Sequence, residues 1–345
     1  MSRATTLRPN RGFTLVELMV GIVVALAAAL VVTEIFKVSE GQRRATSGGD
    51  DAQTTGAIAI SLMQRDLRQA GQGFSTANLL DCQLDLGNSR TFPELAPVSI
   101  NPPGIAAGDA DTDVLVVAYG SGSGLPEGTL INTQPGAATY AVAAPQAFRL
   151  GDRVVAAPAT RAASCALNLT TVSANPTATS VQVAFGMANA SNGVLYNLGN
   201  APRFVAYSVR GSQLTVCDFA TQDCTNSSLT NWTEVADGIV GLRAEYARDT
   251  SVPRDTIADV YDRTAPATVC AWSRVVGVRL AIVARSRQAE KANVAASAPS
   301  WSGSAPLTLS NVNADWQRYR YKTFETTMPL RNLPGATDPN FAACP

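Results

Sequence analysis

The chain has 345 residues, 27 basic and 27 acidic side chains, a charged fraction of 16% and no histidine. Because nucleic-acid-binding domains are usually strongly basic, this balance argues against such a role on composition. The lack of histidine excludes His-based catalytic triads and His metal ligands. The low charge, with abundant Ala, Thr, Ser, Val and Gly, instead indicates a β-rich extracytoplasmic domain.

A basic leader precedes a long apolar run at the N-terminus. Residues 1–12 contain three arginines and no acidic residue, and residues 13–33 carry a single charge, Glu17. Twenty-one residues span about 31 Å as a helix, enough to cross a membrane. By the positive-inside rule the N-terminus stays cytoplasmic. A lone carboxylate in such a run costs roughly 2.5–3.5 kcal/mol, so Glu17 requires a partner.

The stretch Gly12-Phe13-Thr14-Leu15-Val16-Glu17 resembles the processing site of type IV prepilins and type II secretion pseudopilins. The resemblance implies cleavage between Gly12 and Phe13 by a prepilin peptidase, followed by N-methylation of Phe13. It also implies that the new ammonium pairs with Glu17 of a neighbouring subunit. From the residues alone, Thr14 and Glu17 also have the capping-box spacing of an ordinary signal-anchor helix.

Helical periodicity continues beyond the membrane segment. The apolar residues of the second half share one helical face: Ile60, Met63, Leu67 and Ala70. The other face carries Arg65, Asp66, Arg68 and Gln69. Gly48 and Gly49 predict a weakened or kinked joint near residues 46–50, because an interior glycine costs about 1 kcal/mol against alanine. Gly71 is suited to end the helix.

The rest of the chain reads as β-structure. Residues 71–105 show no clean period and predict a long connection pinned by Cys82. Strand-like segments then cover residues 113–119, 153–157, 181–185, 203–210, 213–219, 238–246, 274–285 and 319–328. Short strands separated by turn residues predict a mainly antiparallel sheet.

A second resemblance covers the helix end and the C-terminal third. The segments MQRDLRQAG (63–71), DGIVGLRAEY (237–246), VVGVRLAIVAR (275–285), RYRYK (318–322) and MPLRN (328–332) resemble PilW-type minor pilins. The J-type minor pseudopilins of type II secretion share the D-G strand and the apolar strand after it, but the order of segments favours the PilW type. About residues 80–230 remain unmatched, and partner specificity is expected there.

The resemblance implies an α+β, pilin-like fold, in which a long N-terminal transmembrane and amphipathic helix packs on a mainly antiparallel periplasmic β-domain. The expected parts are a removed leader (1–12), a helix (13–71, transmembrane about 13–33) and a β-rich globular domain (72–345). The protein would reside in the inner membrane, N-terminus cytoplasmic and bulk periplasmic, and then reach the pilus and cell surface.

The implied function is structural, without enzymatic activity or cofactor: a minor pilin of the tip or initiation complex that promotes pilus assembly. Implied partners are the prepilin peptidase, other minor pilins, the major pilin, the inner-membrane assembly platform and, as a candidate, a tip adhesin. The alternatives are a J-type pseudopilin, a DNA-uptake minor pilin and, from a different class, a membrane-anchored enzyme. No residue set supports the last of these.

Six cysteines follow the membrane segment: Cys82, Cys165, Cys217, Cys224, Cys270 and Cys344. An even number in an oxidising compartment predicts up to three disulfides. Cys217 and Cys224 are the expected local pair, and Cys344 is expected to tie down the tail. A zinc site is the rival interpretation, but the C-x6-C spacing is too wide for common zinc motifs, so no metal is expected.

Three further patterns resemble ligand sites. The glycine-rich stretch 120–124 precedes Leu125-Pro126, which cannot open a phosphate-binding helix, so a turn or loop is predicted. Asp109, Asp111 and Asp113 are spaced like the start of a calcium loop, but its later glycine and glutamate are missing. A solvated acidic loop is favoured there, and weak calcium binding stays open.

The third pattern is a basic and aromatic alternation near the C-terminus. Arg318, Arg320 and Lys322 alternate with Tyr319 and Tyr321 on an expected strand. Such a ladder could face phosphates, with the tyrosines as stacking platforms. The favoured interpretation places the aromatic rings toward the core and the basic groups in water. Nucleic-acid binding is therefore not expected.

Overall fold

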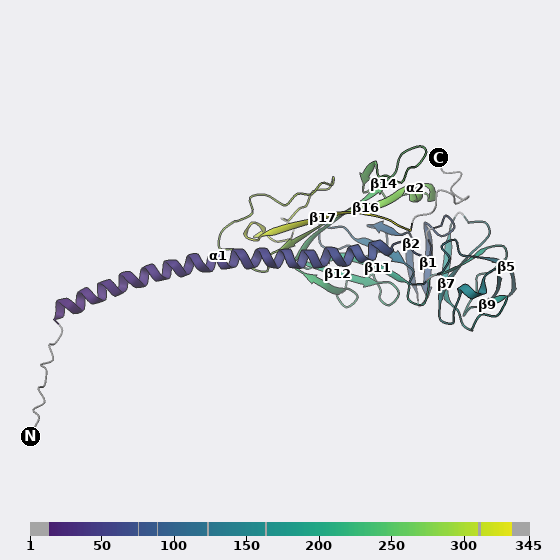
Figure 1. The fold of residues 1–345 in the computed structure, drawn as a ribbon, viewed down its shortest axis with the longest axis horizontal. Coiled ribbons are helices and arrows are strands. Elements are labelled where there is room, and N and C mark those ends of the chain that lie inside the picture. The colour runs from purple at the N-terminus through teal and green to yellow at the C-terminus, as the bar shows by residue number, and fades with distance from the viewer. Residues whose placement is uncertain are drawn as a thin grey trace, which may run out of the picture.

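The computed structural model describes residues 14–332 except 75, 88, 123, 163, 310 and 311. One long helix, α1 (Leu15–Gln69), projects from an elongated β-rich domain, and only its C-terminal half lies against that domain (Figure 1). A long N-terminal helix followed by mostly antiparallel sheets is the predicted pilin-like architecture, and the α+β fold class is confirmed.

Helix α1 begins with a capping box and runs unbroken for 55 residues. The Glu17 amide donates to Thr14 Oγ1 at 3.2 Å, and the Thr14 amide donates to Glu17 Oε2 at 3.3 Å. The predicted joint at residues 46–50 is wrong, because the helix continues through both glycines there. Gly48 is buried, and a Cβ on it would lie 3.0 Å from the Ser286 Cβ. This glycine allows close packing and does not interrupt the helix.

The packed half of α1 presents small residues to the domain. Its buried residues recur every three or four positions: Gly48, Ala52, Gly56, Ala59, Met63, Asp66 and Leu67. They pack mainly on β17 (Tyr321–Pro329) and β16 (Val275–Arg285). The predicted apolar face is correct for Met63 and Leu67, but Asp66, expected on the polar face, is only 3% exposed.

Two antiparallel sheets lie next to the helix. The first has the order β15 (Val260–Asp262), β14 (Ile239–Arg248), β16 and β17, with the short helix α2 (Val269–Ser273) before β16. The second has the order β13 (Thr233–Asp237), β12 (Gln213–Asp218), β11 (Arg203–Arg210), β4 (Leu115–Tyr119) and β3 (Val98–Ile100). The predicted β11–β12 hairpin is confirmed.

A third sheet has eight strands in the order β2 (Arg90–Leu95), β1 (Cys82–Gly87), β8 (Ala166–Thr171), β7 (Arg153–Ala157), β10 (Val194–Asn197), β5 (Thr129–Gly136), β6 (Thr139–Val142) and β9 (Ser180–Gln182). Strands β1 and β8 pair in parallel. The bridge between Val172 and Val183 joins the ends next to β8 and β9. Strands β5 to β10 (residues 129–197) thereby close into a small barrel, the barrel lobe.

The barrel lobe has its own apolar interior and an outlying position. Its largest buried side chains are Tyr140, Phe148, Leu195 and Ile131, which form a cluster separate from the helix-facing core. The short helix η1 (Pro145–Ala147) covers part of it. In Figure 1, strands β5, β7 and β9 lie beyond the C-terminal end of α1, at the end of the molecule farthest from the N-terminus.

The prediction of a strandless connection over residues 71–105 is wrong, because β1, β2 and β3 lie within it. Strand β1 does alternate, with Leu84 and Leu86 buried and Asp85 exposed. The alternation lasts six residues and ends at Gly87, and β2 contains Pro93, so no long period is visible in the sequence.

Candidate functional site

The exposed half of α1 is the first candidate site, and it is almost wholly apolar. The helix contains an 18-residue window of mean hydropathy 2.8, none of it buried in the described chain. The exposed apolar side chains are Leu15, Val16, Leu18, Met19, Val20, Ile22, Val23, Val24, Leu26, Leu30, Val31, Val32, Ile35, Phe36 and Val38. A surface of this size requires lipid or neighbouring helices to cover it.

Glu17 is the only charged residue between Leu15 and Thr33. Its carboxylate contacts Thr14, through the local hydrogen bonds of the capping box, and it forms no ion pair within the described residues. The capping box satisfies helix-end amides but leaves the negative charge uncompensated. The cleavage and methylation residues, Gly12 and Phe13, lie outside the described residues, so their roles stay predictions.

Charged pairs mark the end of the apolar segment. Lys37 Nζ lies 2.8 Å from Glu34 Oε1, and Arg44 Nε lies 3.0 Å from Glu40 Oε1. The hydrogen bond from Arg44 lowers the pKa of Glu40. The helix therefore has three parts: an exposed apolar segment, a short charged segment around residues 34–44, and a segment packed on the domain.

Asp66 joins the packed half of α1 to the second sheet. The Tyr207 hydroxyl donates to Asp66 Oδ2 at 2.6 Å, and the Tyr119 hydroxyl donates to Asp66 Oδ1 at 3.1 Å. Burial, with the Asp66 charge, raises the pKa of both tyrosines, that of Tyr119 to about 12. Both phenols therefore stay protonated and donate throughout the physiological range. Sequence analysis missed this role, although Asp66 lies between Met63 and Leu67 of the apolar face.

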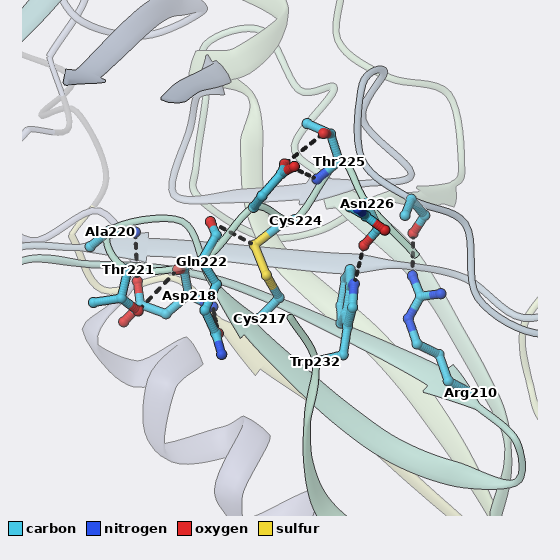
Figure 2. The surroundings of a disulfide bond; sticks show 12 residues. Arg210, Cys217, Asp218, Ala220, Thr221, Gln222, Cys224, Thr225, Asn226 and Trp232 are labelled. Carbon is cyan, nitrogen blue, oxygen red and sulfur yellow. Dashed lines mark hydrogen bonds between the residues drawn. A yellow bond between two sulfur atoms is a disulfide. The ribbon is translucent and has the colours of Figure 1, made fainter. Parts of the chain in front are cut away.

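Two disulfides tie the domain together. Cys217, at the end of β12, is bonded to Cys224 seven residues later, and Figure 2 shows this bond closing the loop. Cys82 on β1 is bonded to Cys165, 83 residues away, just before β8. Cys270 is also disulfide-bonded. Cys344 lies outside the described residues.

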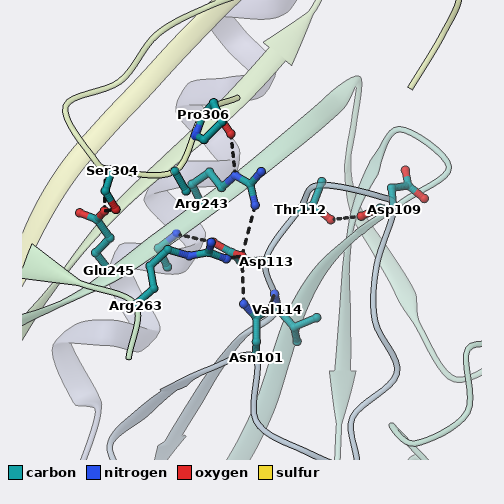
Figure 3. A network of polar contacts seen from close by, with 12 residues as sticks. Asn101, Asp109, Thr112, Asp113, Val114, Arg243, Glu245, Arg263, Ser304 and Pro306 are labelled. Carbon is teal, nitrogen blue, oxygen red and sulfur yellow. Dashed lines mark hydrogen bonds and ion pairs between the residues drawn. The ribbon is translucent and has the colours of Figure 1, made fainter. Parts of the chain in front are cut away.

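The acidic loop is engaged in structural contacts. Asp113, 1% exposed, accepts hydrogen bonds from the Asn101 amide at 2.9 Å and the Ala244 N–H at 3.0 Å, and it pairs with Arg243 and Arg263 (Figure 3). Asp109 instead accepts from the amides of the turn between β11 and β12. Across the described ranges, no group of three or more Asp, Glu or Cys side chains is arranged to hold a metal ion.

The glycine-rich loop 120–124 packs against the chain after β10. A Cβ on Gly122 would lie 2.7 Å from the Gly199 Cα, and one on Gly124 would lie 2.7 Å from the Asn197 carbonyl oxygen. The absence of side chains lets two backbone segments approach, as expected of a packed turn. The Gly120 and Ser121 amides donate to the Gln72 and Leu198 carbonyls, so these two amides are engaged within the chain.

The basic and aromatic alternation does not form the expected ladder, because β17 begins only at Tyr321 and Arg318 belongs to the short helix η2 (Trp316–Arg318). Arg320 Nε lies 2.9 Å from Glu290 Oε1, and Arg318 Nε donates to the Glu290 carbonyl at 2.8 Å. The Tyr319 ring has the Arg285 guanidinium 4.7 Å from its centroid. These groups are engaged with one another and do not form an exposed stacking platform.

An exposed, apolar N-terminal helical segment with one carboxylate, followed by an antiparallel β-domain, is the architecture expected of the type IV pilin class. Comparison with family models supports this class and narrows it. The model of the prokaryotic N-terminal methylation motif matches residues 7–33, and the model described as Type IV Pilus-assembly protein W matches residues 204–332. The chain is a PilW-like type IV minor pilin. The second match runs from β11 to the segment after β17 and leaves the barrel lobe outside.

Among solved structures, a type IV-like pilin from Thermus thermophilus aligns with 83% of this chain and 97% of its own, at 11% identity and a TM-score of 0.36. The search of curated proteins found no match.

Proposed function

We propose that this minor pilin acts in the tip or initiation complex of a type IV pilus. The observation that carries the proposal is the position of the barrel lobe beyond the C-terminal end of α1 (Figure 1). In a filament built from parallel, axially offset helices, the next subunit toward the tip lies above that end of each domain. In such a filament the lobe would occupy this space, which supports a place at the end of the filament and not in its interior.

The exposed half of α1 supplies the assembly contact. Cleavage after Gly12 would free the Phe13 amine about one helical turn from Glu17. An intermolecular pair between this ammonium and Glu17 of a neighbour would compensate both charges within an apolar bundle, where leaving one charge unpaired is costly. The pair would also fix the axial offset, while the surrounding apolar side chains leave lipid for neighbouring helices.

The proposed orientation places the N-terminus in the cytoplasm and the β-domain in the periplasm. The basic leader supports this orientation by the positive-inside rule, and disulfide bonds are typical of an oxidising compartment. The proposed partners are the prepilin peptidase, the major and other minor pilins, and the inner-membrane assembly platform. The role is structural, as it is for the pilin class.

Two alternatives make different demands on the same fold. A J-type pseudopilin would use the same helix in a secretion machine. A DNA-uptake pilin needs free cationic groups along a surface, and the pairing of Arg318 and Arg320 with Glu290 removes the residues first considered for that role.

The proposal is tested by locating the protein on filaments. A short epitope inserted in the exposed hairpin loop at residues 175–178 of the barrel lobe should be labelled at one end of each sheared pilus. Deleting the gene should reduce the number of pili and leave their diameter unchanged. Label along the filament length would contradict the tip position. Rescue of protein secretion, without any effect on piliation, would favour the J-type alternative.

A further inference from the structure

The first sheet has an open edge along β17. In the order β15-β14-β16-β17, this strand pairs with β16 over all nine of its residues, without a bulge, and the described part of the chain places no strand on its other side. The other strands that end the three sheets are shorter: β2 has six residues, β13 has five, and β3, β9 and β15 have three each. A long exposed edge is a template for pairing with another strand.

The direction of the backbone groups in β17 follows from the hydrogen bonds at its two ends. The Ser286 amide donates to the Arg320 carbonyl at 2.8 Å, and the Leu330 amide donates to the Val276 carbonyl at 2.9 Å. Because bonded and outward positions alternate along an antiparallel strand, the even-numbered residues of β17 bond to β16. The outward amides and carbonyls, which make no hydrogen bond within the described residues, belong to Tyr321, Thr323, Glu325 and Thr327.

The side chains of β17 agree with an edge that is open up to its last residue. Pro329 occupies an outward position, where the missing amide takes no hydrogen bond away from the sheet. Charged side chains can also block an edge, but the Glu325 carboxylate accepts from the Ser302 amide at 3.1 Å and is held by that loop. The outward groups before Pro329 are therefore available for pairing.

Both faces of β17 are already covered by this chain. On one face, a Cβ on Gly56 of α1 would overlap the Phe324 ring. On the other face, the Tyr321 hydroxyl donates to the Trp316 carbonyl at 2.8 Å, within a cluster of apolar side chains from the segment before β17. Since β16 occupies the inner edge, the outer edge is the part of β17 left for a partner, and Thr327 is exposed there.

The open edge follows the exposed half of α1 along the molecule. A Cβ on Gly48 would lie 3.0 Å from the Cβ of Ser286, which bonds to the residue before β17. At the other end, the Asn332 side-chain amide donates to the Ala70 carbonyl at 3.1 Å. Strand β17 therefore runs in the same direction as α1, alongside its packed half (Figure 1). Its edge begins about 15 Å along the helix from Val38.

We propose that the outer edge of β17 receives an extended strand of a different pilin subunit, so that the first sheet continues across the contact. The inference rests on the proposed place of the chain in a filament, where parallel α1 helices bring domains side by side. An extended segment is the fitting occupant because a strand carries donors and acceptors at the spacing of those on β17. A second copy does not fit. Antiparallel pairing of two β17 strands would point their α1 helices in opposite directions, which a shared membrane does not allow.

The first experiment removes one outward donor. The Thr327 amide makes no bond to β16, so Thr327→Pro should leave the Tm of the full-length protein in non-ionic detergent at the wild-type value. In cells, the variant should show a several-fold loss from sheared filaments. Thr327→Val keeps the amide and nearly the same side-chain shape, so it is the matched control and should assemble as wild type. Thr326→Pro removes an amide that bonds to β16 and should lower Tm.

Photo-cross-linking gives a second measurement that keeps every backbone amide, so it does not depend on how the proline variant folds. The photoreactive residue p-benzoylphenylalanine replaces Thr327, and its adducts in cells are identified by mass spectrometry. An adduct to another pilin supports the proposal. The control replaces Leu229, which is exposed on the loop between β12 and β13, and should not give that adduct.

The outcomes separate this inference from the proposed function. The inference is overturned if position 327 gives no pilin adduct, or adducts to a second copy alone. It is also overturned if Thr327→Pro, with unchanged Tm, reaches filaments at the wild-type level, or if Thr327→Val is lost equally. Absence of wild type from sheared filaments would contradict the proposed function, and the adducts formed in membranes would still decide whether the β17 edge pairs with a pilin.

Discussion

The two halves of α1 differ in how the same helix uses its surface. From Leu15 to Val38 most apolar side chains are large and exposed, and the hydrogen bonds of Glu17 are all to the neighbouring Thr14. From Gly48 to Leu67 the buried residues are mostly small, and the helix contacts the sheets along its whole length. The large side chains of the first half can pack against another helix or lipid. The small residues of the second half let the β-domain approach the helix closely.

This difference suggests that the exposed half serves assembly and the packed half serves folding of the domain. A change in the exposed half should alter association and leave the folded domain intact, while a change in the packed half should do the reverse. Because most helical stability in proteins comes from packing and not from propensity, the packed half depends on tertiary contacts and the exposed half on its surroundings.

The largest effect is expected at Glu17. Glu17→Val should be processed and inserted normally but lost from sheared pili, because the freed ammonium of a neighbour would have no carboxylate partner. Immunoblots of pilus and membrane fractions measure this. Val23→Leu, a conservative change in the same apolar segment, is the control and should assemble as wild type. Normal incorporation of Glu17→Val would break the proposed division between the halves.

In the packed half, Gly56 should be the most sensitive position. A Cβ there would overlap the ring of Phe324, so Gly56→Leu should destabilise the domain by about 3 kcal/mol or more. Gly49→Leu is the matched control, because nothing lies within 4 Å of a Cβ at that position and the helix gains propensity. Denaturant unfolding followed by tryptophan fluorescence compares the two. Equal stability of the variants would show that the close approach of the helix to β17 is not needed.

Loss of the Asp66 carboxylate should have a somewhat smaller effect. Asp66→Ala leaves the buried hydroxyls of Tyr119 and Tyr207 without their acceptor, which should cost about 2–3 kcal/mol. Asp50→Ala changes an exposed acid on the same helix and should be nearly neutral. The triple variant Asp66→Ala/Tyr119→Phe/Tyr207→Phe should recover part of the loss, because no orphaned hydroxyl remains. If Asp66→Ala lowers the free energy of unfolding no more than Asp50→Ala does, these hydrogen bonds do not stabilise the contact between helix and sheet.

The smallest effect should be a pH dependence that belongs to the domain and not to the exposed helix. Burial, reinforced by Asp81, raises the pKa of Glu94 from 4.5 to about 7. The folded state therefore holds this proton more tightly than the unfolded chain. The stabilisation is complete below about pH 4.5 and is lost as the pH rises through about 7, a change on the order of 1–2 kcal/mol. Glu94→Gln should flatten this part of the stability profile and unfold at higher temperature than wild type at alkaline pH. An unchanged profile would show that Glu94 titrates normally.

Much of this architecture could be predicted because its signals are long or chemically unusual. The apolar run with one carboxylate is visible without any structure, and the 11 residues of β16 are mostly apolar and buried, as suits a strand inside its sheet. Strands β1 to β3 were not predicted, because they are short and because Gly87 and Pro93 interrupt the pattern. Local sequence carries little information when pairing with distant strands stabilises a segment.

The polar contacts of the domain were less predictable still. From the sequence, Asp66 and Asp113 were both expected to be solvated. The partners of Asp66, Tyr119 and Tyr207, lie 53 and 141 positions away. The partners of Asp113, Arg243 and Arg263, lie 130 and 150 positions away. Closure of the barrel lobe rests on one bridge between Val172 and Val183. Such contacts depend on the path of the whole chain, so a pattern within a few residues cannot reveal them.

The most direct test of the central claim is mass spectrometry of the N-terminus of the protein recovered from sheared filaments and from membranes. An N-methylated Phe13 terminus in the filament fraction is the predicted result, because the exposed half of α1 can then pair its ammonium with Glu17 of a neighbour. An intact Met1 in that fraction, or a terminus well beyond Val32, would contradict the assignment of this helix as the assembly element.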